Sequence, residues 1–250
     1  MASPVLPASH RALPKAPRRR NAAERVDLIL DATERYLLEQ GLDGIGLPAI
    51  ARTAGLPAAS LYHLFPSTEA ALVGLLRRYN ALMDREFNAL AVRIEAPTWQ
   101  EWIRQLFAAG RDFYRRHPAH ALLVFRALGF GGLRRADDGH IMEQGRAMAA
   151  ELDRRFLLPP VARLDERLAI AIALSDRVWA FDPAPASATG PAPEGATGPA
   201  CDGVISDATF EESQRAVLSY LGNYLPPVLE RRPADTSAMP PASSIATRAS

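Results

Sequence analysis

A proline-free stretch from Thr68 to about Ile94 sets the strongest constraint on the fold of this chain of 250 residues. Its apolar side chains recur every three or four residues, which is the spacing of one face of an α-helix. They are Leu72, Leu75, Leu76, Tyr79, Leu82, Met83, Phe87 and Leu90. A helix of this length spans about 40 Å at about 1.5 Å per residue. The stretch therefore predicts one long helix that connects two parts of the protein.

Apolar residues with the same spacing predict further helices before and after this one. These helices cover residues from about 22 to 40, 47 to 54, 57 to 64, 99 to 117, 121 to 130, 137 to 157, 162 to 181 and 206 to 225. Runs in which apolar and polar residues alternate, which would predict β-strands, are missing. The sequence therefore predicts an all-α fold and excludes an enzyme that is built on a β-sheet.

The composition is that of an ordinary globular protein, with 48% hydrophobic and 23% charged residues. No window approaches the roughly 18 consecutive apolar residues of a membrane-spanning helix, and the first residues lack the apolar stretch of a secretory signal. We therefore expect a cytoplasmic protein without a membrane partner. The single cysteine, Cys201, has no metal-ligand spacing around it, so we expect neither a metal nor a cofactor.

Basic residues are concentrated near the start of the chain, although its formal net charge is only +1. Residues 1–20 carry five basic and no acidic side chains, together with four prolines and no apolar repeat. We expect them to form a disordered basic arm, which is either a solvated tail or a clamp on phosphate groups. Residues 182–204 contain the motif ATGPA twice and are expected to be a flexible insertion, and residues 231–250 a disordered tail.

Residues 47–73 have the pattern of a helix-turn-helix, in which a second short helix presents side chains to the major groove of DNA. Gly55 supplies the permissive turn between the two short helices. The apolar side chains that face the domain core at helical spacing are Ile50, Leu56, Leu61 and Phe65. Those left toward solvent are Ala58, Ala59, Ser60, Tyr62 and His63. An exposed tyrosine beside an exposed histidine favours contact with a partner.

The first helix ends with the letters EQG, and the IA pair, the segment LYHLFPS and a long helix follow it. Through these features, residues 22–80 resemble the TetR family of bacterial transcriptional regulators. This resemblance implies a three-helix DNA-binding domain at residues 21–67 and a helical ligand-sensing and dimerisation domain at residues 68–230. It also implies a homodimer, made by the helices near 162–181 and 206–225 as a four-helix bundle with the partner copy.

The same resemblance implies which residues contact double-stranded DNA. Ser60, Tyr62 and His63 would lie on the recognition helix, where Tyr62 would reach a phosphate or a thymine methyl group. Leu47 would lie near the DNA backbone at the start of the preceding helix. Ala59 and Thr68 complete the expected contacts of the helix-turn-helix.

At several positions the chain departs from the pattern of the family, and two of these are Ala58 and Ala59, which replace longer side chains. Pro48 stands where a basic residue often touches phosphate, Leu64 where a histidine often follows the tyrosine pair, and Thr68 where a lysine commonly opens the long helix. Each lost phosphate contact weakens binding at physiological ionic strength. We expect basic residues that precede the first helix to restore the charge by entering the adjacent minor groove. These residues are Arg18, Arg19 and Arg20.

Large aromatic side chains in the second domain predict an apolar cavity that binds a small-molecule effector of apolar or aromatic character. The expected lining residues are Trp102, Phe107, Tyr114, Phe125 and Trp179. Each of them singly would also serve as an ordinary core residue. His117 and His120 have a spacing seen in metal sites, but Pro118 separates them, and Asp137, Asp138 and His140 are expected to cap a helix.

No nucleophile with a nearby base, phosphate-binding loop or carboxylate pair stands out, so we do not expect an enzyme. The sequence favours a homodimeric DNA-binding regulator, specifically a repressor that a small ligand releases from a palindromic operator. The alternative is a helical sensor or protein-interaction module of the same fold that has lost DNA binding. A third class, an α-helical enzyme, would require a polar convergent pocket.

Overall fold

The computed structural model describes residues 18–127, 129–181 and 205–233. The expectations for the arm before Arg18, the insertion at 182–204 and the tail beyond 233 therefore lie outside the described residues. The helices are α1 (Arg18–Gln40), α2 (Leu47–Ala54), α3 (Ala58–Tyr62), α4 (Thr68–Arg93), α5 (Trp99–Arg116), α6 (Pro118–Phe125), α7 (Gly131–Arg155), α8 (Leu164–Ala180) and α9 (Asp207–Leu221). Across these ranges the only extended pairing is an isolated bridge between Phe156 and Arg231, so the prediction of an all-α fold is confirmed.

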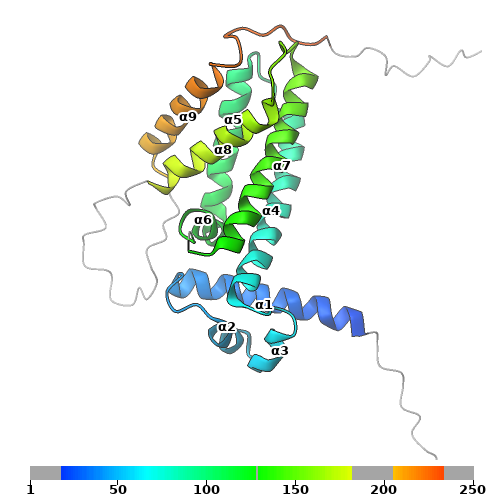
Figure 1. Ribbon diagram of the computed structural model, residues 1–250, viewed down its shortest axis with the longest axis vertical. Helices are drawn as coiled ribbons and strands as arrows, with labels where there is room; N and C mark the ends of the chain where they lie inside the picture. Colours follow the sequence, from blue (N-terminus) through cyan, green and yellow to red (C-terminus); the bar gives the residue numbers. More distant parts are fainter. Residues whose placement is uncertain (1–17, 128, 182–204, 234–250) are drawn as a thin grey trace, which may run out of the picture.

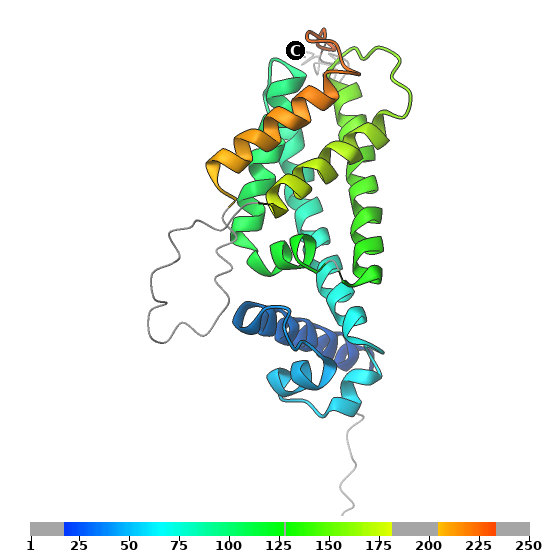
Figure 2. The ribbon, with the colours of Figure 1, turned by 60° about the vertical axis from the view of Figure 1, so that its left-hand side comes forward.

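The long helix α4 joins two groups of helices. Figure 1 shows α1, α2 and α3 gathered at one end of the molecule and α5 to α9 at the other, with α4 running from the first group into the second. The view in Figure 2 shows the same arrangement from a second direction. The predicted role of α4 as a connecting rod is therefore confirmed. None of the helices in the described residues is long and apolar enough to cross a membrane.

Local capping signals fix the ends of several helices. Ser67 Oγ accepts a hydrogen bond from Ala70 N at 3.1 Å and thereby caps α4. Ser206 Oγ accepts one from Thr209 N at 3.2 Å and caps α9 in the same way. Gly55 ends α2 with φ 65°, in the left-handed region that glycine adopts without strain. All three ends agree with the sequence-based expectation.

Three helices begin earlier than predicted, among them α6, which covers Pro118–Phe125 where residues 121–130 were expected. The helix α1 starts at Arg18, so the three arginines expected in a disordered arm form its first turn, as good helix formers do. The helix α7 starts at Gly131, which places Asp137, Asp138 and His140 inside the helix and makes their predicted role as caps wrong. The glycines at 131 and 132 do not break this helix because the carboxylate of Glu69, at the start of α4, accepts a hydrogen bond from Gly132 N.

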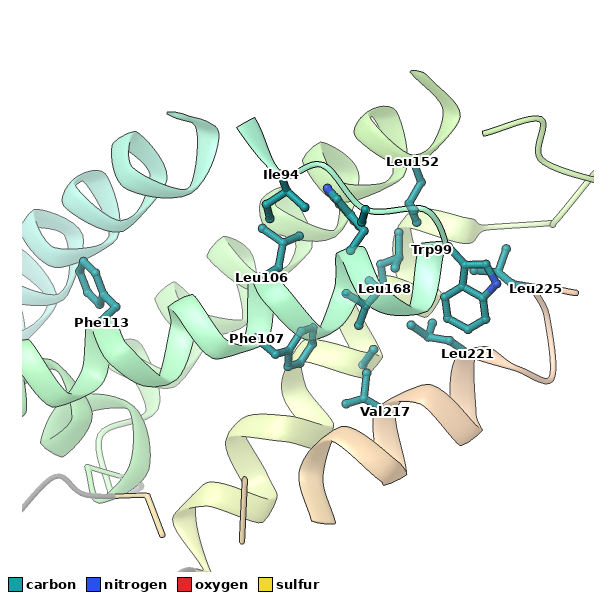
Figure 3. Close-up of a cluster of buried hydrophobic side chains, with 14 of the residues drawn as sticks. Ile94, Trp99, Leu106, Phe107, Phe113, Leu152, Leu168, Val217, Leu221 and Leu225 are labelled. Carbon is teal, nitrogen blue, oxygen red and sulfur yellow. The ribbon is translucent and has the colours of Figure 1, made fainter. Parts of the chain in front are cut away.

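Each group of helices has its own hydrophobic core. In the first, apolar side chains of α1, α2, α3 and α4 meet, with Ile29, Ile50, Leu61, Leu72 and Leu75 fully buried. In the second, shown in Figure 3, Trp99 lies beside Leu221 and Leu225 at the end of the bundle. The indole Nε1 of Trp99 donates to Pro226 O at 2.8 Å, which ties the segment after α9 to the start of α5.

The helices α7 and α8 pack unusually closely because Gly145 has no side chain. A Cβ atom at this position would lie 2.9 Å from Ala169 N and would also collide with the backbone oxygen of Asp165. Only glycine lets the backbones of the two helices approach this far. Two walls of the bundle are thereby held together.

Candidate DNA-binding surface and ligand cavity

The helix α3 presents one polar and one apolar face. Leu61 is fully buried and Phe65, just after the helix, is 8% exposed, whereas Tyr62 is 52% exposed and His63 is exposed as well. The turn at Gly55 sets this orientation, with Leu56 N donating to Ala51 O at 3.0 Å. The two rings that the sequence placed toward solvent therefore lie on the surface.

The remaining expected DNA contacts are distributed unevenly. Ala59 is exposed, and Ser60 and Thr68 are half-buried. Leu47 is only 3% exposed and belongs to the core of the first group of helices, so its expected contact with the DNA backbone is wrong. Its side chain packs inward because α2 begins there and turns its apolar face toward α1. Leu56, expected in the core, is only half-buried.

The sequence interpretation missed one basic residue in the helix-turn-helix. Arg52 lies exposed in the last turn of α2, directly before the turn at Gly55. Its neighbour Ala51 is buried, and the helical repeat places Arg52 on a different face. This spacing was readable from the sequence and would have identified a cation next to α3.

A cavity of about 400 Å³ lies among α4, α5, α7 and α8. Four of the five aromatic residues expected to line it do so: Trp102, Phe107, Tyr114 and Trp179. Phe125 does not line this cavity. It packs behind it against Tyr114, with 4.8 Å between the ring centroids, so its expected place in the lining is wrong. From α4, Met83 and Phe87 complete the apolar part of the wall.

The cavity also contains acidic groups that the sequence did not reveal as a set, because they come from three different helices. They are Asp84 of α4, Glu143 and Glu151 of α7, and Asp176 of α8. Burial raises the pKa of the Asp176 carboxyl well above its usual range, and the nearby Asp137 acts in the same direction. Burial also raises the pKa of Asp84, which the adjacent His140 partly offsets.

Between the cavity and the first group of helices lies a stack of rings. The ring of Tyr114 lies 5.1 Å from that of His120, which in turn lies 5.1 Å from that of Tyr79. The Tyr79 hydroxyl then donates to Glu34 Oε1 in α1 at 2.5 Å, and Arg78 holds the other oxygen of the same carboxylate at 2.6 Å. Residues in direct contact thus lead from the cavity wall to α1.

The two histidines with metal-like spacing, His117 and His120, pack among these aromatic rings. His120 is 1% exposed, and its Nε2 lies 3.2 Å from Asn80 Oδ1. Burial lowers the pKa of His120 to about 3, with further contributions from His140 and His117. His117 contacts Phe113, with 4.4 Å between the ring centroids. Within the described ranges no group of three or more histidine, cysteine or acidic side chains is arranged to hold a metal ion.

Comparison with known proteins bears on the first group of helices. Residues 29–73, which run from α1 into α4, match the family model described as bacterial regulatory proteins of the tetR family. In this segment the chain is similar to the tetR family of bacterial regulatory proteins. Here α2 and α3 form the helix-turn-helix, of which α3 is the second helix.

A curated relative of this chain is the HTH-type transcriptional repressor NemR of Escherichia coli strain K12. The two are 36% identical over 62 residues, which is 25% of this chain and only 31% of NemR. The match therefore spans about a third of the length of that relative.

Solved structures extend the likeness of the fold to most of the chain. A TetR-family transcriptional regulator from Pectobacterium atrosepticum has a TM-score of 0.58 at 17% identity and covers 86% of this chain and 100% of its own. One from Streptomyces coelicolor has a TM-score of 0.57 at 19% identity, with 80% and 99% covered. At these identities the likeness concerns the fold alone, including the helical bundle after α4.

Proposed function

We propose that this chain is a DNA-binding transcriptional repressor that a small ligand releases from its operator. The observation that carries the proposal is the exposed pair Tyr62 and His63 at the end of α3, held outward by the buried Leu61 and Phe65. A tyrosine hydroxyl and a histidine nitrogen donate to phosphate oxygens or base edges, and a tyrosine ring also contacts a thymine methyl group. Arg52 adds an exposed cation for a nearby phosphate.

The proposed active form is a homodimer that binds a palindromic duplex. Two copies of α3 would enter successive major grooves, about 34 Å apart. An apolar stripe on α8 supports pairing through this helix: Ile170 is 45% exposed, and Leu174 and Phe181 follow at helical spacing. The indole Nε1 of Trp179 donates to Ser213 Oγ at 2.8 Å and fixes α9 beside α8.

The proposed release of DNA begins in the cavity. A ligand there would contact Tyr114 and the α4 side chains, and the stack through His120 and Tyr79 ends at Glu34 in α1. A ligand shifts the protein away from its DNA-binding form only as far as it binds the other form more tightly. The proposal assigns no catalytic role and no cofactor to the chain, and it places the protein in the cytoplasm with the DNA.

Selection of duplexes from a random oligonucleotide pool tests this function. The full-length protein is expected to enrich an inverted repeat whose half-sites lie about one helical turn apart. Affinity for the enriched duplex should fall steeply as salt concentration rises, because phosphate contacts release counterions. Selection that enriches no sequence would contradict the proposal.

The second candidate, a sensor or interaction module without operator binding, rests on the scarcity of cations. Residues 56–68, which contain α3, include no lysine or arginine. Under this alternative the protein would dimerise and bind ligand, but it would elute from a random-DNA column at very low salt. Retention to about 0.2 M salt or above would exclude this alternative.

A further inference from the structure

The charged residues that line the cavity between α4, α5, α7 and α8 are all acidic. Its lining contains four acidic residues, Asp84, Glu143, Glu151 and Asp176, and no lysine, arginine or histidine. The whole chain, by contrast, has 29 basic and 28 acidic residues. The imbalance is therefore a property of this site and does not follow from the composition.

Only one of these four carboxylates has an arginine partner among the described residues. Glu151 binds Arg155 at 2.5 Å and Arg154 at 2.6 Å. The imidazole of His140 lies 3.6 Å from Asp84, but burial lowers the pKa of His140, which keeps the ring neutral at pH 7. The side chain of Asp176 has one hydrogen-bond partner among the described residues, the Tyr114 hydroxyl at 3.4 Å.

Asp84, Glu143 and Asp176 thus remain without a cation. Burial first, and then the Coulombic influence of Glu143 on Asp84 and of Asp137 on Asp176, makes full ionisation costly while the cavity is empty. A positive charge inside the cavity would lie near carboxyl groups from α4, α7 and α8 at once and would remove this cost.

Two further groups in the cavity wall lack a partner. Ser175 is 1% exposed and Trp102 is fully buried, yet neither Ser175 Oγ nor Trp102 Nε1 has a hydrogen-bond partner in the described residues. A buried polar atom without a partner destabilises the folded protein, because it has lost its hydrogen bonds to water. Both residues line the cavity, so a bound molecule is in a position to supply the missing partners.

The remaining wall is aromatic. Phe107 and Trp179 meet edge to face, with 6.4 Å between ring centroids, and Tyr114 lies 5.9 Å from Trp179. Faces of aromatic rings attract cations, most strongly where water is excluded. The cavity volume of about 400 Å³ lies in the range of roughly 300–1,000 Å³ that is typical of small-molecule sites.

We propose that the effector of this protein is an organic cation with an aromatic or apolar body. The body would lie against Trp102, Phe107 and Trp179, and the charged group would face Asp84, Glu143 and Asp176. That the bound cation acts as an effector rests on the proposed function. Binding of the cation to the cavity does not depend on DNA.

Calorimetric titration of the full-length protein with three probes that share one ring system tests the proposal. The probes are (1-naphthylmethyl)trimethylammonium, 1-naphthalenemethanol and 1-naphthaleneacetate, which present a positive, a neutral and a negative group. The cation should bind at least about tenfold more tightly than the alcohol, and the acetate should bind more weakly than either. Asp176→Asn and Glu143→Gln should each lower the affinity for the cation at least about threefold and leave that for the alcohol unchanged.

Asp112→Asn serves as the matched control, because it removes one negative charge from α5 at a residue that pairs with Arg115 outside the cavity. It should leave all three affinities unchanged. Equal or tighter binding of the alcohol or the acetate would overturn the proposal, as would absence of binding by all three probes or an equal effect of the control. A selected operator bound normally under any of these outcomes would leave the proposed function intact.

Discussion

The hydroxyl group of Tyr79 donates a hydrogen bond to Glu34 Oε1 across 2.5 Å and thereby joins α4 to α1. The ring of the same tyrosine stacks on His120 of α6 at 5.1 Å. Burial and the Glu34 carboxylate raise the pKa of Tyr79, so its hydroxyl remains a donor at neutral pH. One side chain therefore contacts both the DNA-binding helices and the bundle that contains the cavity.

A double-mutant cycle measures this connection. Tyr79→Phe keeps the ring but removes the donor, and it should lower the free energy of unfolding by about 0.5–1.5 kcal/mol. Combined with Glu34→Gln, the two effects should fall short of additivity by at least about 0.5 kcal/mol in urea denaturation. Additive effects would mean that the hydrogen bond contributes nothing in solution.

The exposed ring of Tyr62 leads to a different expectation, because little of it packs against the protein. Tyr62→Ala should weaken binding of the selected duplex at least about tenfold, or about 1.4 kcal/mol. The unfolding free energy should change by less than about 0.5 kcal/mol, as for other surface positions. Val228→Ala, at a 79% exposed position after α9 and outside the cavity, is the control that should change neither quantity. Undiminished DNA binding by Tyr62→Ala would remove this ring from the proposed contact surface.

Two glycines of α7 should respond to alanine in opposite directions. Gly145→Ala places a methyl group against the backbone of α8, 2.9 Å from Ala169 N, and should destabilise the protein by about 1–3 kcal/mol. Gly139 has no atom within 4 Å of the corresponding position, so Gly139→Ala should stabilise it by about 0.4–1 kcal/mol. Thermal unfolding of both variants checks the pair, and equal shifts of Tm would contradict the close packing of α7 on α8.

Burial of neutral His120 makes stability depend on pH. Its pKa falls to about 3 in the folded protein, against about 6.5 when unfolded, so between these values the unfolded chain binds more protons. This contribution is fully present above about pH 6.5 and is lost as the pH falls toward 3. His120→Asn should reduce the slope of unfolding free energy against pH by up to about 1.4 kcal/mol per pH unit in this window.

Urea denaturation at several pH values between 4.5 and 7.5 provides the comparison. Only the difference in slope between the two proteins matters here, because Asp137 titrates in the same window with the opposite sign. Burial raises the pKa of Asp137 to about 6, so its contribution to stability decreases as the pH rises from about 3.8 to 6. Parallel profiles of the parent protein and the variant would show that His120 is not held neutral by burial.

Local signals made much of the fold predictable. The ends of α2, α4 and α9 depend on Gly55, Ser67 and Ser206, whose effects act within three or four residues along the chain. The outward position of Tyr62 followed from helical spacing alone, since buried Leu61 is its direct neighbour.

Features that depend on distant residues were not predictable in this way. The start of α7 was placed too late because Glu69, which accepts from Gly132 N, lies 63 residues earlier in the chain. Leu47 was assigned to the DNA contacts from the family resemblance, and nothing in the sequence near it reveals how closely α2 packs on α1. The acidic lining of the cavity escaped notice for the same reason, since its members meet only after the helices pack.

The close contact of Gly145 in α7 with α8 affects which helix around the cavity moves when a large ligand binds. The backbones of α7 and α8 are in close contact at Gly145, and separating the two helices would break this contact. The pair therefore resists separation. Another wall of the cavity is α4, which follows directly after the helix-turn-helix in the chain. We therefore expect a ligand that is too large for the cavity to displace α4, whose first turn adjoins the helix-turn-helix.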